Sequence, residues 1–555
     1  MNSKTNQTSQ KLRGGYYTSP EVARWICDWA IRSRSDVVLE PSCGAGAFLL
    51  AAAERLARLK TPARSIASNL RATEIIPAEA EAATALLRPR LGRSAENVVT
   101  VGDYFAWWQS NERMFDAVVG NPPFIRYQSF PEAHRSLAMV IMQSLGLSPN
   151  RLTNIWVPFV VAAAARLRKG GRLGLVLPAE ILQVSYAAQL RKFLADRFTR
   201  LDIVTCNELF FDAEQEVVLL LAEGASEPSE NNKCRVSMTE CETVAEVTGR
   251  TPKALLKAAK PKTIRHDTEK WLKYFLSARE IAFMRALRDA DNTTVLSTHA
   301  TVDVGVVTGR NEFFVLSKEQ VETLGLSKYT FPLVSRSAQL KGTKIGKSDW
   351  ETLAASGNRM HLLNISPAEA RNLSNALRRY IKQGEEREYH RGYKCSIRNP
   401  WYIVPSVWTP DAFMFRQIYN FPRIVLNDSG ATSTDTIHRV RCKQGNPERV
   451  IANTYTWLTA ASAEIEGRSY GGGVLELEPT EAERLLVPAE LNGALPVSEC
   501  DRLIRADKLD DVLEENARTV LRHHMGLSAA DCKTLKYIWT KMRDRRMSRR
   551  KSATA

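Results

Sequence analysis

The first ~220 residues alternate short apolar runs with helical hydrophobic patterns, and this alternation restricts the possible folds more than any other feature. Strand-like runs separated by helices predict a mostly parallel sheet that is covered by helices. Seven strands are expected, at 37–39, 69–73, 98–101, 115–119, 172–177, 201–204 and 217–222. The main helices are expected at 20–32, 47–59, 78–87, 155–168 and 186–198. The fold class is therefore α/β, with a Rossmann-like sheet.

The regular alternation ends near the polar segment 227–232, where a domain end and a linker are expected. The following pattern is mixed, and the C-terminal part is helical and strongly basic. The predicted organisation is a polar tail at 1–13, an α/β domain at 14–225, a last strand and linker at 226–263, a mixed α/β domain at 264–498 and a helical basic segment at 499–555.

Charge and composition restrict the class of partner. Lys and Arg outnumber Asp and Glu by 77 to 61 in 555 residues, which favours a polyanionic partner such as nucleic acid. The nine cysteines include no C-x-x-C pair, so reduced thiols, a cytoplasmic location and no metal site are expected. The N-terminus has no apolar signal region, and the apolar run at 155–165 is too short to span a bilayer. No membrane partner is therefore expected.

The tetrapeptide Asn121-Pro122-Pro123-Phe124 follows the apolar run at 115–120. It is expected just past the carboxyl end of a strand, where ligands bind in open α/β sheets. Asn121 offers a side-chain carbonyl, Pro122 offers a main-chain carbonyl, and the prolines restrict the backbone. Two acceptors beside an aromatic ring suit a planar substrate that carries an exocyclic amino group.

Acidic residues are expected at the ends of the three preceding strands. Glu40 comes before a compact turn that contains Gly44, and Glu74 and Asp103 follow the next two strands. A glycine turn lets a ligand approach the backbone, and the Glu40 carboxylate suits a cationic amine or sulfonium better than a pyrophosphate. An acid after the second strand can bind ribose hydroxyls. Strand-end acids also cap helices, but four polar residues on four successive strands, Asn121 included, predict one ligand crevice.

These motifs resemble those of the class I, S-adenosylmethionine-dependent DNA adenine-N6 methyltransferases in the gamma, TaqI-like order, in which the cofactor motifs precede N-P-P-[YF]. The upstream sequence G-Y-Y-T-S-P-E-V-A at 15–23 fits as well. The resemblance implies a methyltransferase domain, a following target-recognition domain, S-adenosylmethionine as cofactor and duplex DNA as partner. It also allows a separate restriction endonuclease acting on the same site. The implied cofactor contacts are Tyr16, Thr18, Glu40, Gly44, Glu74, Asp103, Tyr104 and Pro123.

The expected chemistry is direct methyl transfer to an aromatic amine. Asn121 and Pro122 would accept hydrogen bonds from the amine and turn its lone pair toward the methyl group, so positioning drives the reaction. A target atom inside a duplex requires the base to be flipped out of the stack. Phe124 is expected to stack on the flipped ring, and Phe210 in Leu209-Phe210-Phe211 resembles a later aromatic motif that packs on the base.

Three stretches of the C-terminal half are expected to contact DNA, at 304–314, 391–402 and 468–473, because they resemble the family or interleave basic and aromatic residues. The basic end of the chain is expected to contact phosphates, which position a protein on DNA without specifying sequence. The residues expected to contact DNA are Arg310, Asn311, Arg391, Lys394, Arg398, Trp401, Arg545 and Arg546.

Three other functions compete with this interpretation. An RNA or protein N-methyltransferase can carry N-P-P-[YF], but a C-terminal half of ~290 residues favours DNA sequence reading. A fused restriction–methylation enzyme is disfavoured because only about 13 residues precede the first cofactor motif. A DNA-binding protein with an inactive methyltransferase fold is disfavoured by the intact acids and Asn121. Cytosine-C5 chemistry is not expected, because the sequence has no Pro-Cys dipeptide.

Overall fold

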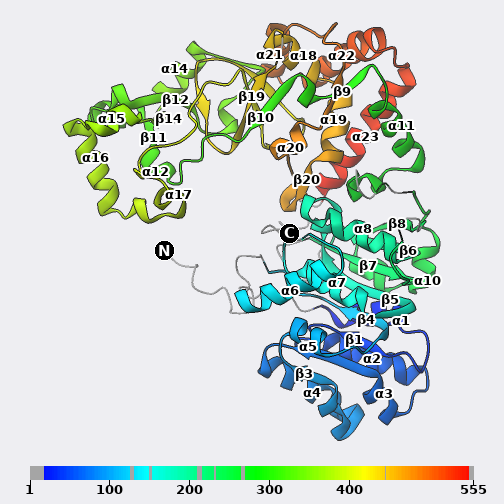
Figure 1. The fold of residues 1–555 in the computed structure, drawn as a ribbon. Coiled ribbons are helices and arrows are strands. Elements are labelled where there is room, and N and C mark those ends of the chain that lie inside the picture. Colours follow the sequence, from blue (N-terminus) through cyan, green and yellow to red (C-terminus); the bar gives the residue numbers. More distant parts are fainter. Residues whose placement is uncertain are drawn as a thin grey trace. The chain divides into compact units, whose positions relative to one another are not determined.

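The computed structural model describes residues 18–125, 131–148, 153–208, 216–229, 233–263, 265, 269–443 and 445–548. The chain divides into two compact units: unit 1 comprises Met1–Ala278 and Ser548–Ala555, and unit 2 spans Arg279–Met547 (Figure 1). Each unit is described by itself. This division is coarser than the five predicted segments, whose limits stay predictions.

Unit 1 is built on an eight-stranded sheet with the order β3-β2-β1-β4-β5-β7-β6-β8. Its strands are β1 (Val38–Glu40), β2 (Leu70–Glu74), β3 (Val99–Val101), β4 (Phe115–Gly120), β5 (Leu167–Pro178), β6 (Arg200–Cys206), β7 (Val217–Glu223) and β8 (Arg235–Cys241). All pairs are parallel except those of β7, which runs antiparallel to both β5 and β6. The predicted mostly parallel α/β sheet is confirmed.

The sheet has eight strands: seven were predicted with bounds, and β8 falls within 226–263, where a last strand was predicted without bounds. The additional strand, β8, extends the sheet beside β6 over seven residue pairs, from Arg200↔Arg235 to Cys206↔Cys241. It is an edge strand in which buried Val236 is followed by partly exposed Met238, with exposed Arg235 and Glu240. Because one side of this edge strand is solvated, its sequence lacks the continuous apolar run that marks a central parallel strand.

Helices cover both faces of the unit 1 sheet (Figure 1). The helices α1, α2 and α4 share a buried cluster on one face, and α5, α7 and α8 pack on the other. The α-helices of unit 1 are α1 (Pro20–Ala30), α2 (Ala47–Arg58), α3 (Ala63–Asn69), α4 (Pro77–Leu91), α5 (Tyr104–Ser110), α6 (Glu132–Ser144), α7 (Trp156–Ala165), α8 (Ala188–Arg197), α9 (Val244–Thr248) and α10 (Pro252–Lys257).

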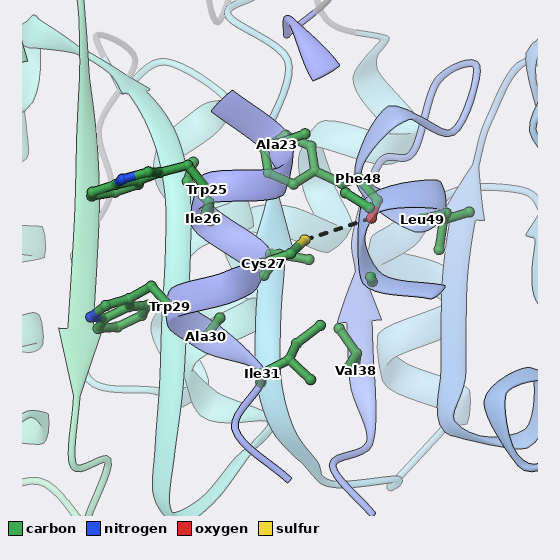
Figure 2. Packing of buried hydrophobic residues seen from close by; sticks show 14 of the residues in the cluster. Ala23, Trp25, Ile26, Cys27, Trp29, Ala30, Ile31, Val38, Phe48 and Leu49 are labelled. Carbon is green, nitrogen blue, oxygen red and sulfur yellow. Dashed lines mark hydrogen bonds between the residues drawn. The ribbon is translucent and has the colours of Figure 1, made fainter. Parts of the chain in front are cut away.

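Helix α1 fixes the N-terminal side of the candidate site to the core. It begins with Ser19, whose side chain accepts from the Val22 amide, and Pro20 occupies its first turn, as helix starts favour. Cys27 on α1 faces the start of α2, where its Sγ lies 3.7 Å from the Phe48 carbonyl oxygen (Figure 2). Trp25 and Trp29 of α1 are also buried. Burial of this helix places Thr18, two residues before it, at a defined point on the sheet edge.

Unit 2 contains a five-stranded sheet with the order β10-β19-β15-β17-β13 and a four-stranded sheet with the order β11-β14-β12-β18. Smaller sheets have the orders β16-β21-β20 and β22-β9. The strands are β9 (Thr293–Val295), β10 (Ala300–Asp303), β11 (Val315–Ser317), β12 (Thr330–Val334), β13 (Lys344–Gly346), β14 (Arg359–Leu363), β15 (Ala412–Phe415), β16 (Gln417–Ile418), β17 (Ile424–Asp428), β18 (Thr432–Ser433), β19 (Ile437–Cys442), β20 (Arg468–Tyr470), β21 (Val474–Glu476) and β22 (Leu486–Pro488).

Helices surround these sheets, so unit 2 is a mixed α/β unit with a helical C-terminal part. Its helices are α11 (Ala278–Arg288), α12 (Asn311–Phe314), α13 (Lys318–Thr323), α14 (Lys347–Ala355), α15 (Pro367–Arg371), α16 (Asn375–Glu386), α17 (Tyr393–Ser396), α18 (Pro447–Thr454), α19 (Trp457–Glu466), α20 (Pro479–Ala482), α21 (Val497–Arg505), α22 (Leu509–Asn516) and α23 (Ala529–Ser548). Among the residues described in both units, no helix is long and apolar enough to cross a membrane.

Candidate functional site

Glu40 ends β1 at the middle of the unit 1 sheet, between β2 and β4. Its side chain is buried, and Oε2 has no hydrogen-bond partner among the described residues. Burial and the nearby Glu74 carboxylate raise the pKa of Glu40 well above its ordinary value, although the Leu49 amide opposes the shift. Gly120 at the end of β4 lies beside it, since a Cβ at Gly120 would stand 3.5 Å from Glu40 Cγ. A buried acceptor of this kind suits a ligand that brings a positive charge.

Glu74 ends β2 and closes the turn after β1. Its Oε2 accepts from the Gly44 amide at 2.8 Å, and its Oε1 accepts from the Ile76 amide at 2.9 Å. Gly44 has a φ of +49°, a conformation that glycine adopts without a Cβ penalty, and a Cβ there would meet no atom within 4 Å. A carboxylate has about four lone-pair positions, so Glu74 keeps acceptor capacity for ligand hydroxyls.

Asn121 lies just past β4, and its side-chain amide is hydrogen-bonded to Thr18, near the start of the described chain. Asn121 Nδ2 donates to Thr18 Oγ1 at 3.2 Å, a bond between residues 103 positions apart. Thr18 is buried, and Asn121 is half-buried. With its amide nitrogen directed to Thr18, the side-chain oxygen of Asn121 is the end of the amide that can accept from a substrate amine.

Asp103 follows β3 and caps α5, because its Oδ1 accepts from the Ala106 amide at 2.9 Å. Its Oδ2 lies 3.0 Å from His134 Nδ1, on α6. The ring of Tyr104 is 2% exposed and stacks on Phe159 with ring centroids 5.2 Å apart. Asp103 therefore caps a helix, the alternative role of strand-end acids, and Tyr104 is packed into the core. Their roles toward a cofactor stay predictions.

The rest of the predicted site is described in part. Pro122 is buried, and Pro123 and Phe124 are half-buried, with Phe124 packed against the core cluster of the sheet. Tyr16 and Phe210 lie outside the described residues. The structure thus brings together Thr18, Glu40, Gly44, Glu74 and Asn121 at the carboxyl ends of β1, β2 and β4.

The residues predicted to contact DNA fall into two groups in unit 2. Arg310, Asn311, Arg391 and Lys394 are exposed. Arg398, by contrast, donates to two main-chain carbonyls, those of Thr308 and Val307, at 2.8 and 2.6 Å. The Trp401 ring packs on Phe313 with centroids 4.8 Å apart, and its Nε1 donates to Glu385. Arg398 and Trp401 therefore hold this part of unit 2 together.

One predicted phosphate contact is wrong in this structure. Arg546 is 2% exposed and forms a bidentate ion pair with buried Glu464, with Nη2 to Oε1 at 2.6 Å and Nε to Oε2 at 3.1 Å. It also donates to the carbonyls of Tyr419 and Gly473. The guanidinium is fully engaged inside unit 2 and is not available to a phosphate. Arg545 beside it is half-buried, and Arg549 and Arg550 lie outside the described residues.

Two contacts of the site were not predicted from the sequence. The pairing of Asp103 with His134 has no sequence signal, because His134 lies on a helix that was not predicted. The bond from Asn121 to Thr18 joins two residues that were both singled out, but for separate roles. The burial of Arg546 did have a signal, since it continues the buried positions Cys532, Leu535, Trp539 and Met542 at helical spacing.

The fold and the site define an α/β domain in which acidic and amide side chains gather at the carboxyl ends of parallel strands, where ligands bind in open α/β sheets. Two family models match the chain: "Eco57I restriction-modification methylase" at 69–210 and "Type II methyltransferase M.Eco57I, C-terminal domain" at 268–521. These matches confirm the resemblance to restriction–modification DNA methyltransferases that the motifs predicted.

Relatives extend over most of the chain. It is 23% identical over 487 residues to type II methyltransferase M.AccI of Acinetobacter calcoaceticus, covering 84% of each chain. It is 25% identical over 522 residues to type II methyltransferase M.PaeR7I of Pseudomonas aeruginosa, covering 86% of each chain. The fold is similar to that of the type IIL restriction–modification enzyme MmeI in complex with DNA, with a TM-score of 0.52 and 12% identity over 96% of this chain and 72% of that chain.

Proposed function

We propose that this chain is a site-specific DNA methyltransferase of the gamma order that transfers a methyl group from S-adenosylmethionine to N6 of a flipped adenine. The observation that carries the proposal is the Asn121 amide, held by Thr18 just past β4 and beside the β1 tip that presents Glu40. The relatives that span most of the chain are type II methyltransferases, which supports a modification enzyme of a restriction–modification system.

The residues of the crevice fit the proposed cofactor. The unpartnered Glu40 Oε2 suits a cationic amine, and Glu74 beside the Gly44 turn suits ribose hydroxyls. S-adenosylmethionine would supply an electrophilic methyl group there and would depart as a neutral thioether, and the amine would pass one proton to solvent. Asn121 and the Pro122 carbonyl accept from the amine N–H groups and direct its lone pair. This mechanism depends on positioning and needs no nucleophilic side chain.

A transfer assay tests the function. The full chain is incubated with S-adenosylmethionine tritiated in its methyl group and, separately, with unmethylated duplex DNA, tRNA or protein extract. We expect label in duplex DNA only. Digestion of that DNA to nucleosides should recover the label as N6-methyldeoxyadenosine. Label in tRNA or protein and none in DNA would contradict the proposal. A parallel incubation of the DNA with magnesium tests for cleavage, which we do not expect.

Replacement of Glu40 by Gln is expected to weaken S-adenosylmethionine binding. A hydrogen bond to a charged group contributes about 1.5–3 kcal/mol, so the Kd should rise about 13- to 160-fold. The unliganded protein should become no less stable, because burial disfavours the Glu40 carboxylate. Calorimetric titration and thermal unfolding measure the two effects, with exposed Glu96→Gln as control. Unchanged affinity of the Glu40→Gln variant would exclude the assigned role.

The raised pKa of Glu40 also predicts a pH dependence of binding. The native protein holds the Glu40 proton more tightly than the unfolded chain does, so protonated Glu40 stabilises the unliganded fold at low pH. This contribution to the free energy of unfolding is lost as the pH rises through the raised pKa. A cationic ligand has the opposite preference, because it binds the carboxylate. We expect affinity for S-adenosylmethionine to rise with pH through this range in the wild type, and the Glu40→Gln variant to lack that increase in a titration series.

Thr18→Val is expected to slow methyl transfer because Asn121 loses its hydrogen-bond acceptor. A neutral hydrogen bond contributes about 0.5–1.5 kcal/mol, so the single-turnover rate should fall about 2- to 13-fold. Thr18→Ser keeps the hydroxyl and serves as the matched control. A wild-type rate for Thr18→Val with saturating cofactor would show that Thr18 does not orient Asn121.

A further inference from the structure

Tyr393 and Ile397 are the two most exposed large hydrophobic side chains among the described residues, at 74% and 64%. Tyr393 begins the short helix α17, and Ile397 directly follows it. Residues four positions apart lie on one side of a helical turn, so the two side chains form one apolar projection. Large apolar side chains gathered on a surface indicate an interaction site.

This projection is held by a firmly packed base. Cys395 of α17 is fully buried, and Arg398 donates to the carbonyls at 307 and 308. Gly309, with a φ of +83°, lies so close to α17 that a Cβ on it would stand 2.8 Å from Lys394 Cβ. The helices α12, α16 and α17 lie together at this end of unit 2 (Figure 1). The inward side chains thus fix the turn, while the apolar pair is left in solvent.

Three exposed cations lie near the apolar pair: Arg391 and Lys394 belong to the same segment, and Arg310 Nε would stand 3.8 Å from a Cβ on Gly392. The Arg310 guanidinium lies over the Tyr389 ring at 5.6 Å, and Lys394 Nζ lies 5.5 Å from the centre of the Tyr393 ring. Arg310 and Lys394 are both exposed. Arg391 pairs with Glu388 at 2.6 Å, and both side chains are exposed. An apolar projection between cations is complementary to a nucleic-acid groove, where bases lie between two rows of phosphates.

We propose that Tyr393 and Ile397 form an apolar wedge that enters a groove of duplex DNA and contacts its bases, while Arg310, Arg391 and Lys394 contact the adjacent phosphates. The wedge rests on the proposed function, since it assumes that duplex DNA is the substrate. Apolar side chains inserted at a base step unstack it, and stacking on the aromatic ring recovers part of that cost. The binding energy of this contact would therefore depend on how easily the DNA sequence at that step deforms.

Binding of the full chain to unmethylated plasmid fragments tests the wedge. We expect Tyr393→Ala and Ile397→Ala each to raise the Kd at least about fivefold, as loss of a base contact does. The matched control Tyr537→Ala removes another exposed tyrosine, on α23, and should stay within about twofold of the wild type. The slope of log Kd against log salt should be unchanged in Tyr393→Ala, but smaller by about one in Lys394→Ala.

Photo-cross-linking supplies a second readout that does not depend on affinity. The photoreactive amino acid p-benzoylphenylalanine in place of Tyr393 should form a covalent adduct with the plasmid fragments, whereas the same substitution at Tyr537 should not. Unchanged DNA affinity of the variants together with no adduct at position 393 would overturn the wedge. Self-association that Tyr393→Ala abolishes while DNA binding persists would also overturn it. Wild-type DNA binding with adducts but no methyl transfer would support the wedge and contradict the proposed function, so the two failures are distinguishable.

Discussion

Asn121→Ala is expected to lower the single-turnover rate of methyl transfer to DNA by at least about a hundredfold, because one preorganised polar group at a reacting centre contributes on that scale. The substitution removes the acceptor of the amine and its bond to Thr18, but it leaves Glu40 and Glu74 in place. Binding of S-adenosylmethionine should therefore change no more than about threefold, which is the scale of a minor contact. Rapid-quench kinetics and calorimetric titration measure the two quantities.

The matched control for this prediction is Asn97→Ala, which removes an exposed asparagine elsewhere in unit 1. It should leave both quantities at wild-type values. A normal transfer rate for Asn121→Ala would exclude the lone-pair mechanism. Loss of cofactor binding together with the rate would show that Asn121 supports the crevice and does not act on the amine.

Arg546→Met is expected to give the largest loss of stability. It leaves Glu464 buried without its partner, and breaking a buried ion pair costs about 3–5 kcal/mol in the free energy of unfolding. Burial already raises the pKa of Glu464 although Arg546 opposes that shift, so the uncompensated carboxylate would be costly. Urea unfolding followed by the tryptophan fluorescence of unit 2 measures the change.

Two further variants make this stability prediction specific. Arg546→Met combined with Glu464→Leu removes both charges and should recover a large part of the loss, since apolar replacements of a buried pair are tolerated. Arg518→Met breaks the exposed pair with Glu515 and should leave the free energy of unfolding nearly unchanged. If Arg546→Met unfolded like the wild type but weakened DNA binding, Arg546 would be a phosphate contact after all.

The fold of unit 1 could be predicted because its central strands are buried on both faces and appear as continuous apolar runs. The predicted run at 115–119 became β4 (Phe115–Gly120), and the run at 217–222 became β7. The strand β8 could not be predicted in the same way, because an edge strand carries polar residues on its solvated side. The mixed sheets of unit 2 depend on pairings between distant short strands, such as β13 with β17, which no local pattern specifies.

The composition of the site could be predicted in part, but its contacts could not. Strand-end positions brought Glu40, Glu74 and Asn121 to one edge, as the order of the sheet requires. The bond between Asn121 and Thr18 depends on how α1 packs against the sheet, which is a tertiary property. The arginines at the end of α23 look alike in composition. Only the helical spacing of the buried positions distinguishes buried Arg546 from its neighbours.

Sequencing of modified bases in DNA from cells that express this chain tests the central claim most directly. The host should lack adenine methylation of its own, and cells that express Asn121→Ala should be sequenced in parallel. We predict N6-methyladenine at one defined sequence motif with the wild-type chain and at no motif with the variant. Methylation confined to cytosine, or adenine methylation that persists in the Asn121→Ala variant, would contradict the assignment of Asn121 as the residue that directs the adenine amine.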